Sequence, residues 1–212
     1  KKRYIQMFGE TCQIIKSYSP QMEVGGYGLR GDFLEEDDIL DIWGKEKIKP
    51  DFVSAVIYAY IRGTEKEQVF SKRNTDTEAL KNAVLFVREH MDRAGMKDTK
   101  LYITEWNLTI SDRNYINDTC FKGAYIIKNY LDFYGLADMA AYYTGSDRMS
   151  EHYDSNELLF GGRGVLSKDG ILKPAGFAFE FLNRLYPYFV GKGENYLISS
   201  DGHGSYGIIC HN

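Results

Sequence analysis

Glu105 is the residue whose type and position are best suited to chemistry. It is the last residue of a short apolar stretch of strand type, and the alternation of side chains along a strand places it on one face with Leu101 and Ile103. If the sheet is a parallel barrel, the carboxyl ends of its strands form the active-site rim. A carboxylate there, followed by Trp106 and Asn107, would face a ligand. The structural alternative is an ion pair that closes the barrel end.

A second polar cluster follows the fourth predicted strand, in a long loop over 144–173 that lies on the same rim. Asp147 and Glu151 are candidates for substrate contacts, and with His152 and Asp154 they offer an alternative metal site. Their spacing matches no compact metal motif, so we expect no metal. A solvated polar loop is the structural alternative.

Glycine-rich stretches raise the question of a nucleotide site. Gly26, Gly28 and Gly31 formally satisfy the G-x-G-x-x-G spacing, but the next strand, 55–60, carries no acidic residue at its end. The sequence therefore does not favour a dinucleotide, and we expect no cofactor. A second stretch, 161–164, would either let the backbone approach a ligand or fold its loop tightly.

Aromatic residues gather at the expected rim and suit a sugar ligand, because apolar sugar faces stack on rings while hydroxyls bond to polar groups. The alternative is that most of them are core residues. The aromatic candidates for substrate contact are Tyr58, Trp106, Tyr143 and Phe160.

Composition narrows the class of protein. The 212 residues are 43% hydrophobic and 26% charged, with 17 Tyr, 12 Phe and only 4 Pro, which indicates a globular chain with a core. The net charge of -4 and the lack of a basic stripe argue against nucleic-acid binding. No apolar run approaches the ~18 residues of a membrane span. Three distant cysteines, an odd number, predict free thiols in a reducing compartment, so we expect a cytoplasmic protein.

Strand and helix patterns alternate along the chain. Such alternation predicts an α/β fold with a parallel sheet and helices outside it. A doubly wound sheet is one alternative; we prefer strands five to eight of a (β/α)8 barrel, a half barrel over residues 1–189. A hairpin pattern within 190–212 predicts the start of an antiparallel β-module. The predicted strands are 21–26, 51–60, 101–105, 139–143, 196–199 and 206–210, and the predicted helices are 4–15, 33–43, 77–94, 117–134 and 174–185.

Several stretches together resemble glycoside hydrolase family 39, which contains β-xylosidases and α-iduronidases. The run 102–107 (YITEWN) is similar to that family's nucleophile strand, and 142–147 (YYTGSD) to its eighth strand. The glycine loop 161–165 with the Lys-Pro-Ala start at 173–175 also resembles the family, as do 24–26 and Asp118-Thr119. The matches lie in the right order over nearly the whole chain.

The resemblance implies that Glu105 is the nucleophile of a retaining glycosidase acting on xylosides or related glycosides. The family's acid/base is a glutamate in an Asn-Glu-Pro turn after the fourth strand, and this chain has no such turn. Glu10 and Glu23 are poor substitutes, so we expect the acid/base outside this chain. Around Glu105 we expect sugar contacts from Tyr58, Trp106, Asn107, Tyr143, Asp147, Glu151, Phe160 and Gly161. The expected partners are a xylose-type saccharide and the N-terminal half of the barrel or a second copy of the chain.

Two positions depart from the family pattern. Val56 and Phe160 stand where the family usually has histidines that contact sugar hydroxyls. Barrels of this kind also resemble domains fused to AraC-type transcriptional regulators, so a non-catalytic sugar sensor is the alternative function. The lost histidines favour the sensor, whereas the retained Glu105 favours the enzyme.

Overall fold

A computed structural model describes residues 1–30, 38–64, 66, 71–147 and 156–212. The chain divides into two compact units, which we describe separately. Unit 1 comprises Lys1–Trp106 and Gly135–Ala141, and unit 2 comprises Asn107–Tyr134 and Tyr142–Asn212.

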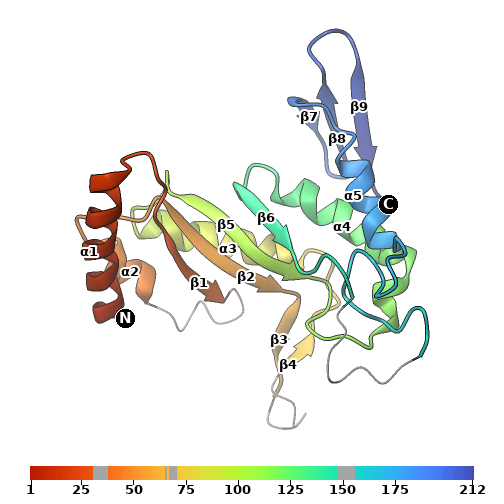
Figure 1. Cartoon of the computed structure of the whole chain (residues 1–212), viewed down its shortest axis with the longest axis horizontal. Coiled ribbons are helices and arrows are strands. Elements are labelled where there is room, and N and C mark those ends of the chain that lie inside the picture. Colours follow the sequence, from red (N-terminus) through yellow and green to blue (C-terminus); the bar gives the residue numbers. More distant parts are fainter. Residues whose placement is uncertain (31–37, 65, 67–70, 148–155) are drawn as a thin grey trace. The chain divides into compact units, whose positions relative to one another are not determined.

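Unit 1 is built around a four-stranded sheet whose strands run parallel (Figure 1). The strands lie in the order β1-β2-β5-β6. Their order in the sheet is therefore the same as their order along the chain. A doubly wound sheet would reverse its order at a switch point, and this one does not. The winding is that of half a barrel, as predicted. The strands are β1 Gly26–Arg30, β2 Phe52–Tyr58, β5 Lys100–Asn107 and β6 Met139–Tyr142, and the helices are α1 Lys2–Tyr18, α2 Ile39–Trp43 and α3 Ala79–Arg93.

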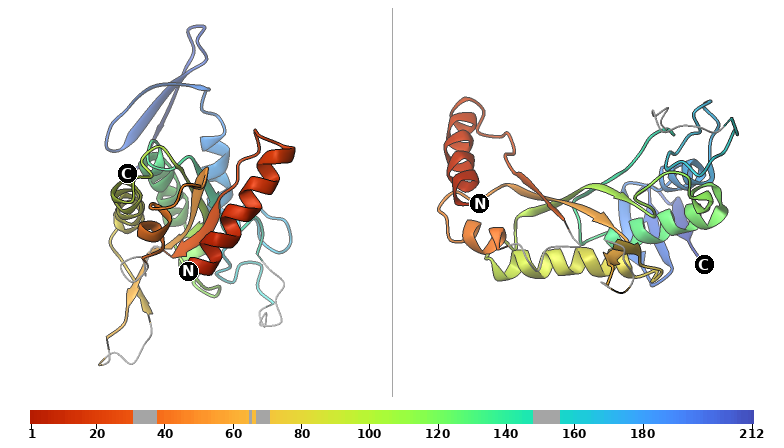
Figure 2. Two further views of the ribbon diagram at one scale, coloured as in Figure 1. Left: turned by 90° about the vertical axis from the view of Figure 1, so that its left-hand side faces the viewer. Right: turned by 90° about the horizontal axis from the view of Figure 1, so that it is seen from below.

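Helix α3 covers one face of this sheet (Figure 2). Its buried side chains are Leu80, Val84, Val87 and Met91, which recur every three or four residues and form one stripe. On β2, Val53, Ala55 and Ile57 are buried, and so is Ser54, while Phe52, Val56 and Tyr58 are half-buried. Ala79, Ala83 and Phe86 flank the stripe of α3 and are half-buried.

The carboxyl end of β2 continues into an antiparallel hairpin that the sequence did not predict. Its strands are β3 Tyr60–Arg62 and β4 Ser71–Arg73. This segment was expected to be a polar loop. The hairpin is anchored at its base where Asn74 N donates to Ala59 O over 2.7 Å.

Two other element boundaries differ from the prediction. The first strand begins at Gly26 rather than at residue 21, and the chain passes so close to β2 that a Cβ at Gly25 would lie 2.1 Å from the carbonyl oxygen of Phe52. Helix α2 starts at Ile39, whereas the predicted helix 33–43 began within residues 31–37, which lie outside the described part of the chain.

Charged pairs hold the amino ends of β5 and β6. The Arg88 guanidinium on α3 donates to Leu136 O at 2.5 Å, to Thr99 O at 2.8 Å and to the Asp138 carboxylate at 2.7 Å. Asp138 also accepts from Leu101 N at 2.8 Å. In barrels this end of the sheet serves stability, whereas function lies at the carboxyl ends of the strands.

Unit 2 contains two packed helices and a three-stranded antiparallel sheet. The elements are η3 Tyr115–Asp118, α4 Cys120–Phe133, α5 Pro174–Leu182, β7 Tyr188–Lys192, β8 Tyr196–Ser200 and β9 Tyr206–Cys210. Helices α4 and α5 approach closely at Gly123, where a Cβ would lie 2.9 Å from the carbonyl oxygen of Pro174. The predicted hairpin is β8 and β9, and β7 joins it as a strand that was not predicted.

Candidate functional site

Glu105 and Tyr58 meet near the carboxyl ends of neighbouring strands. Glu105 is the sixth residue of β5, Tyr58 is the last residue of β2, and the Tyr58 hydroxyl donates a hydrogen bond to Glu105 Oε1. Both side chains are half-buried. A phenol that donates to a carboxylate fixes the direction of that carboxylate. The pair therefore presents an oriented carboxylate at the edge of the sheet where barrels carry their active sites.

Glu105 lies on the other face of β5 from the one that simple alternation of side chains predicts. Tyr102 stacks on Phe52 with ring centroids 4.5 Å apart, and Phe52 shares its face of β2 with Tyr58, six residues later. Glu105 contacts Tyr58, so it lies on this face, while Ile103 is fully buried on the other face. Strict alternation, which put Glu105 with Ile103, does not continue to the end of β5.

Glu23 is held at the opposite end of the sheet. Its carboxylate pairs with the Lys100 ammonium and accepts a 2.5 Å hydrogen bond from the Tyr102 hydroxyl. The hydrogen bond from Lys100, and next that from Tyr102, lower the pKa of Glu23. Lys100 and Glu105 are five residues apart, about 16 Å along a strand. Paired carboxyls of a retaining glycosidase lie ~5–5.5 Å apart, so Glu23 does not form such a pair with Glu105.

Unit 2 contains a buried polar network whose first centre is Lys122 on α4. The side chain is fully buried, and its ammonium donates to Asn107 Oδ1 and, at 2.7 Å, to Asn117 Oδ1. Burial, helped by the nearby positive charges of Lys173 and Arg163, lowers the pKa of Lys122 to about 7. The sequence analysis did not single out Lys122, although a lysine amid the apolar residues of a helix was the available signal.

The second centre is Lys173, immediately before α5. Its ammonium lies 2.9 Å from the Asp147 carboxylate, 2.5 Å from that of Asp118 and 2.8 Å from the carbonyl oxygen of Gly162. The side chains of Lys173 and Asp147 are fully buried. Asp147, a predicted sugar contact, thus lies in a buried ion pair that joins its loop to the start of α5.

The glycine stretch 161–164 packs directly on Asp147. A Cβ at Gly162 would lie 2.3 Å from the Asp147 carboxylate, and one at Gly164 would lie 2.2 Å from the Asp147 backbone nitrogen. Gly164 N donates to Asp147 Oδ1 at 2.7 Å, and Gly161 has φ +78°. Of the two roles considered for these glycines, close packing of the loop is the one that these contacts support.

Tyr143 and Arg163 lie together beside this loop. The Arg163 guanidinium lies 4.8 Å from the centroid of the Tyr143 ring, and its Nε donates to Asp112 at 3.1 Å. Asn107 Nδ2 donates to the carbonyl oxygens of Tyr143 and, at 3.4 Å, of Arg163. The network therefore brings together Asn107, Tyr143, Asp147 and Gly161, four of the predicted site residues.

The other predicted site residues differ in their placement. Trp106 is fully buried and Phe160 is 6% exposed. Glu151 lies outside the described residues, as do His152 and Asp154 of the alternative metal site. In the part of the chain that is described, no group of three or more His, Cys, Asp or Glu side chains is placed to hold a metal ion. Also within that part, no helix is both long and apolar enough to cross a bilayer.

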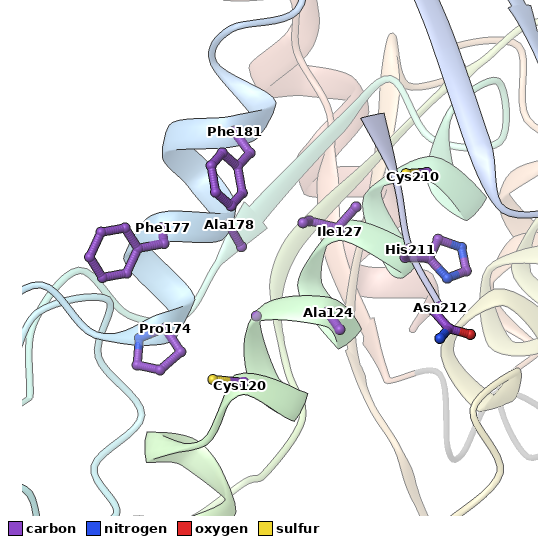
Figure 3. Close-up of a pocket in the computed structure, with 11 residues that line it drawn as sticks. Cys120, Ala124, Ile127, Pro174, Phe177, Ala178, Phe181, Cys210, His211 and Asn212 are labelled. Atoms are coloured by element: carbon purple, nitrogen blue, oxygen red, sulfur yellow. The ribbon is translucent and has the colours of Figure 1, made fainter. Parts of the chain in front are cut away.

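A cavity of about 570 Å³ lies in unit 2 (Figure 3). Side chains from α4, α5 and the last residues of the chain line it, among them Ile127, Phe177, Phe181 and His211. Cys120 and Cys210 also reach it, and both carry free thiols. None of the residues expected to contact a sugar belongs to its lining.

The singly wound parallel sheet, with Glu105 near a strand's carboxyl end, defines part of an α/β barrel. Comparison with known proteins gives the family: residues 1–190 match glycosyl hydrolases family 39, and the chain belongs to this family. The resemblance inferred from the sequence is thereby confirmed.

Two relatives to which the chain is similar are β-xylosidases. Over its full length the chain is 26% identical to the β-xylosidase of Geobacillus stearothermophilus, of which it covers 43%. It is also 26% identical to the β-xylosidase of Caldicellulosiruptor saccharolyticus, over 87% of this chain and 37% of the relative. The chain thus spans about two fifths of the length of these enzymes.

Solved structures agree with the fold. A monomeric β-xylosidase from Caulobacter crescentus CB15 matches 95% of this chain with a TM-score of 0.78 and 27% identity, and the match covers 41% of that enzyme. The GH39 enzyme from Xanthomonas axonopodis pv. citri matches the same share with a TM-score of 0.77 and 26% identity, covering 40% of its length. The half-barrel followed by an antiparallel β-module is confirmed.

Proposed function

We propose that this chain is part of the catalytic domain of a retaining glycoside hydrolase, in which Glu105 is the nucleophile. In the first step the Glu105 carboxylate attacks the anomeric carbon as the bond to the leaving oxygen breaks and an acid protonates that oxygen. In the second step the residue that gave up its proton in the first step takes a proton from water. The water then attacks the anomeric carbon, the bond to Glu105 breaks, and the carboxylate is restored. The observation that carries the proposal is the bond from Tyr58 to Glu105 near the carboxyl ends of two adjacent barrel strands.

The acid/base is proposed to lie outside these residues. Glu23 is paired at the far end of β5, and Glu10, which accepts from Gln6 at 3.1 Å, lies on the exposed side of α1. The relatives are more than twice as long as this chain. The N-terminal half of a barrel is therefore the proposed source of the proton donor.

The same half-barrel, or a second copy of the chain, is the proposed partner of the sheet. β1 and β6 are the outermost strands of the four-stranded order, and an unpaired strand edge favours pairing with further strands. Small-angle scattering tests this: we expect the chain to associate with itself or with a co-expressed N-terminal half. A chain that stays a monodisperse monomer and does not bind the co-expressed N-terminal half would contradict this proposal.

The proposed substrate is a xyloside or a related glycoside, and the support is the similarity to two β-xylosidases. The proposed compartment is a reducing one, such as the cytoplasm. The support for it is the three free thiols, of which Cys12 is buried and Cys120 and Cys210 are exposed.

The test is turnover of an aryl xyloside by the full-length protein that carries these residues. Glu105→Gln removes the nucleophilic charge and keeps the size of the side chain, so turnover should be abolished while xylose binding remains measurable. Glu23→Gln is the matched control, because it makes the same change in a glutamate that pairs with Lys100 at the other end of β5. It should leave turnover within about twofold, as expected of a surface pair.

Two outcomes would contradict the enzyme proposal. One is wild-type turnover that survives Glu105→Gln. The other is a full-length protein that binds sugars and never cleaves an aryl glycoside, which would support the sugar-sensor alternative. Val56, which is half-buried on the same face of β2 as Tyr58, is the feature that would favour that alternative.

A further inference from the structure

Two asparagine amides lie on either side of the buried Lys122 ammonium, and the chemistry of the lysine fixes how each of them is turned. An ammonium has three donors and no acceptor, so the amide atom that faces it must be the oxygen. The NH₂ groups of Asn107 and Asn117 therefore point away from Lys122. This holds at 2.7 Å for Asn117 and for the shorter contact with Asn107.

The two NH₂ groups meet main-chain carbonyls. Asn107 Nδ2 donates to Tyr143 O and to Arg163 O, the latter at 3.4 Å, and Asn117 Nδ2 donates to Gly161 O at 2.9 Å. Carbonyl oxygens are acceptors only, so a flipped amide would lose its bonds to Lys122 and to these carbonyls. The Lys122 ammonium, together with Thr109, which donates to both amide oxygens, thus fixes three carbonyls in two separate chain segments.

These two segments carry residues expected to contact a sugar. Tyr143 follows β6, and Gly161 begins the glycine loop that ends against Asp147. We propose that Lys122 is a positioning residue of the sugar site, which through Asn107 and Asn117 clamps the main chain at Tyr143, Gly161 and Arg163. The inference rests on the proposed function for its link to sugar, while the clamp itself is a property of unit 2.

Lys122 and Lys173 bond to different acceptors, so Lys173 does not supply the donors that Lys122 gives to the two amides. The Asp118 and Asp147 carboxylates are both taken by Lys173, whereas Lys122 bonds to neutral amides alone among the contacts described here. Removal of Lys122 would leave each buried amide oxygen with one donor, Thr109 N at 3.3 Å for Asn107 and Thr109 Oγ1 at 3.0 Å for Asn117. Both amides, and the carbonyls that they hold, would then be less firmly fixed.

The test is hydrogen–deuterium exchange of the full-length protein together with steady-state kinetics. Lys122→Met keeps the length of the side chain and removes its donors. Backbone amides of Arg163 and Gly164, which donate to Asp112 and Asp147, should exchange at least about tenfold faster, with the interior of α4 unchanged. The KM for an aryl xyloside should rise by a similar factor, and more than kcat changes.

Lys128→Met is the matched control. It makes the same substitution on the same helix, and Lys128 pairs with Asp132 at 2.6 Å, away from the three carbonyls. It should leave both the exchange of the loop and the KM unchanged. If Lys122→Met does not fold, Asn107→Asp serves instead: it keeps a partner for Lys122, loses the NH₂ group, and should loosen Tyr143 and Arg163 alone.

The outcomes separate the clamp from the proposed function. Equal hydrogen–deuterium exchange at residues 161–164 in the wild type and in both variants would overturn the clamp. A rise in exchange that is uniform over the whole Lys122→Met chain, with KM unchanged, would overturn it as well. If the loop loosens as expected but the wild type neither binds nor cleaves xylosides, the clamp stands and the proposed function fails.

Discussion

The buried ammonium of Lys122 predicts a specific dependence of stability on pH. Its pKa is about 7 in the folded chain and 10.5 when exposed, because burial penalises the charged form. Below pH 7 the group is charged in both states, so the folded state bears the whole penalty. Between pH 7 and pH 10.5 the unfolded chain keeps the proton and the folded chain does not, so stability rises with pH.

The magnitude follows from that shift. One pKa unit corresponds to about 1.4 kcal/mol, and since the folded state is still about half protonated at pH 7, the gain between pH 7 and pH 9 is about 2 kcal/mol. Lys122→Met removes the titrating group, so the variant lacks this gain. The free energy of unfolding of the wild type minus that of the variant should therefore rise by about 2 kcal/mol over this range.

Urea unfolding at pH 7, 8 and 9 measures this difference, and other groups that titrate in both proteins cancel in the subtraction. Lys128→Met is again the control, and its difference from the wild type should stay constant over the same range. A constant difference for Lys122→Met as well would refute the reasoning, because it would mean that Lys122 keeps an ordinary pKa in the folded chain.

Three further substitutions test the contact at Glu105 and the buried ion pairs of Lys173. Tyr58→Phe removes the donor to Glu105, and since a hydrogen bond to a charged group contributes about 1.5–3 kcal/mol, kcat/KM for an aryl xyloside should fall about tenfold to hundredfold; an unchanged value would show that the bond has no part in catalysis. Lys173→Met leaves Asp147 and a second carboxylate buried without their cation and should lower the free energy of unfolding by about 3–5 kcal/mol, measured by urea unfolding. Arg184→Met removes an exposed pair with Glu180 and should change that free energy by less than about 0.5 kcal/mol; equal effects of these two lysine and arginine substitutions would contradict the network.

The half-barrel could be predicted from the sequence because its strands are apolar and are separated by helices of regular period. The hairpin β3–β4 could not, since its strands carry Arg62, Lys72 and Arg73 and bury no apolar face that would produce an alternating pattern. β7 was missed for a related reason: its residues Tyr188, Phe189 and Val190 are all exposed, so burial gives them no period of two.

The candidate site was predicted in part. The position of Glu105 near the end of a strand follows from the sequence, but its contact with Tyr58 depends on a break in alternation that only the folded strand shows. Asp147 was a candidate because of its acidic side chain, whereas its burial depends on Lys173, 26 residues later. Such long-range pairing of charges leaves no local pattern. Lys122 did leave a local signal, a lysine amid the apolar residues of a predicted helix, but that signal does not reveal its partners Asn107 and Asn117.

The most direct test of the central claim is to trap the covalent intermediate. A 2-fluoro xyloside with a good leaving group slows the release of the sugar from the nucleophile, and peptide mass spectrometry of the full-length protein then locates the added sugar. The account predicts one fluoro-xylosyl group on Glu105 and none in the Glu105→Gln variant. A sugar attached to another carboxylate, or an active enzyme that never acquires an adduct, would contradict the assignment of Glu105 as the nucleophile.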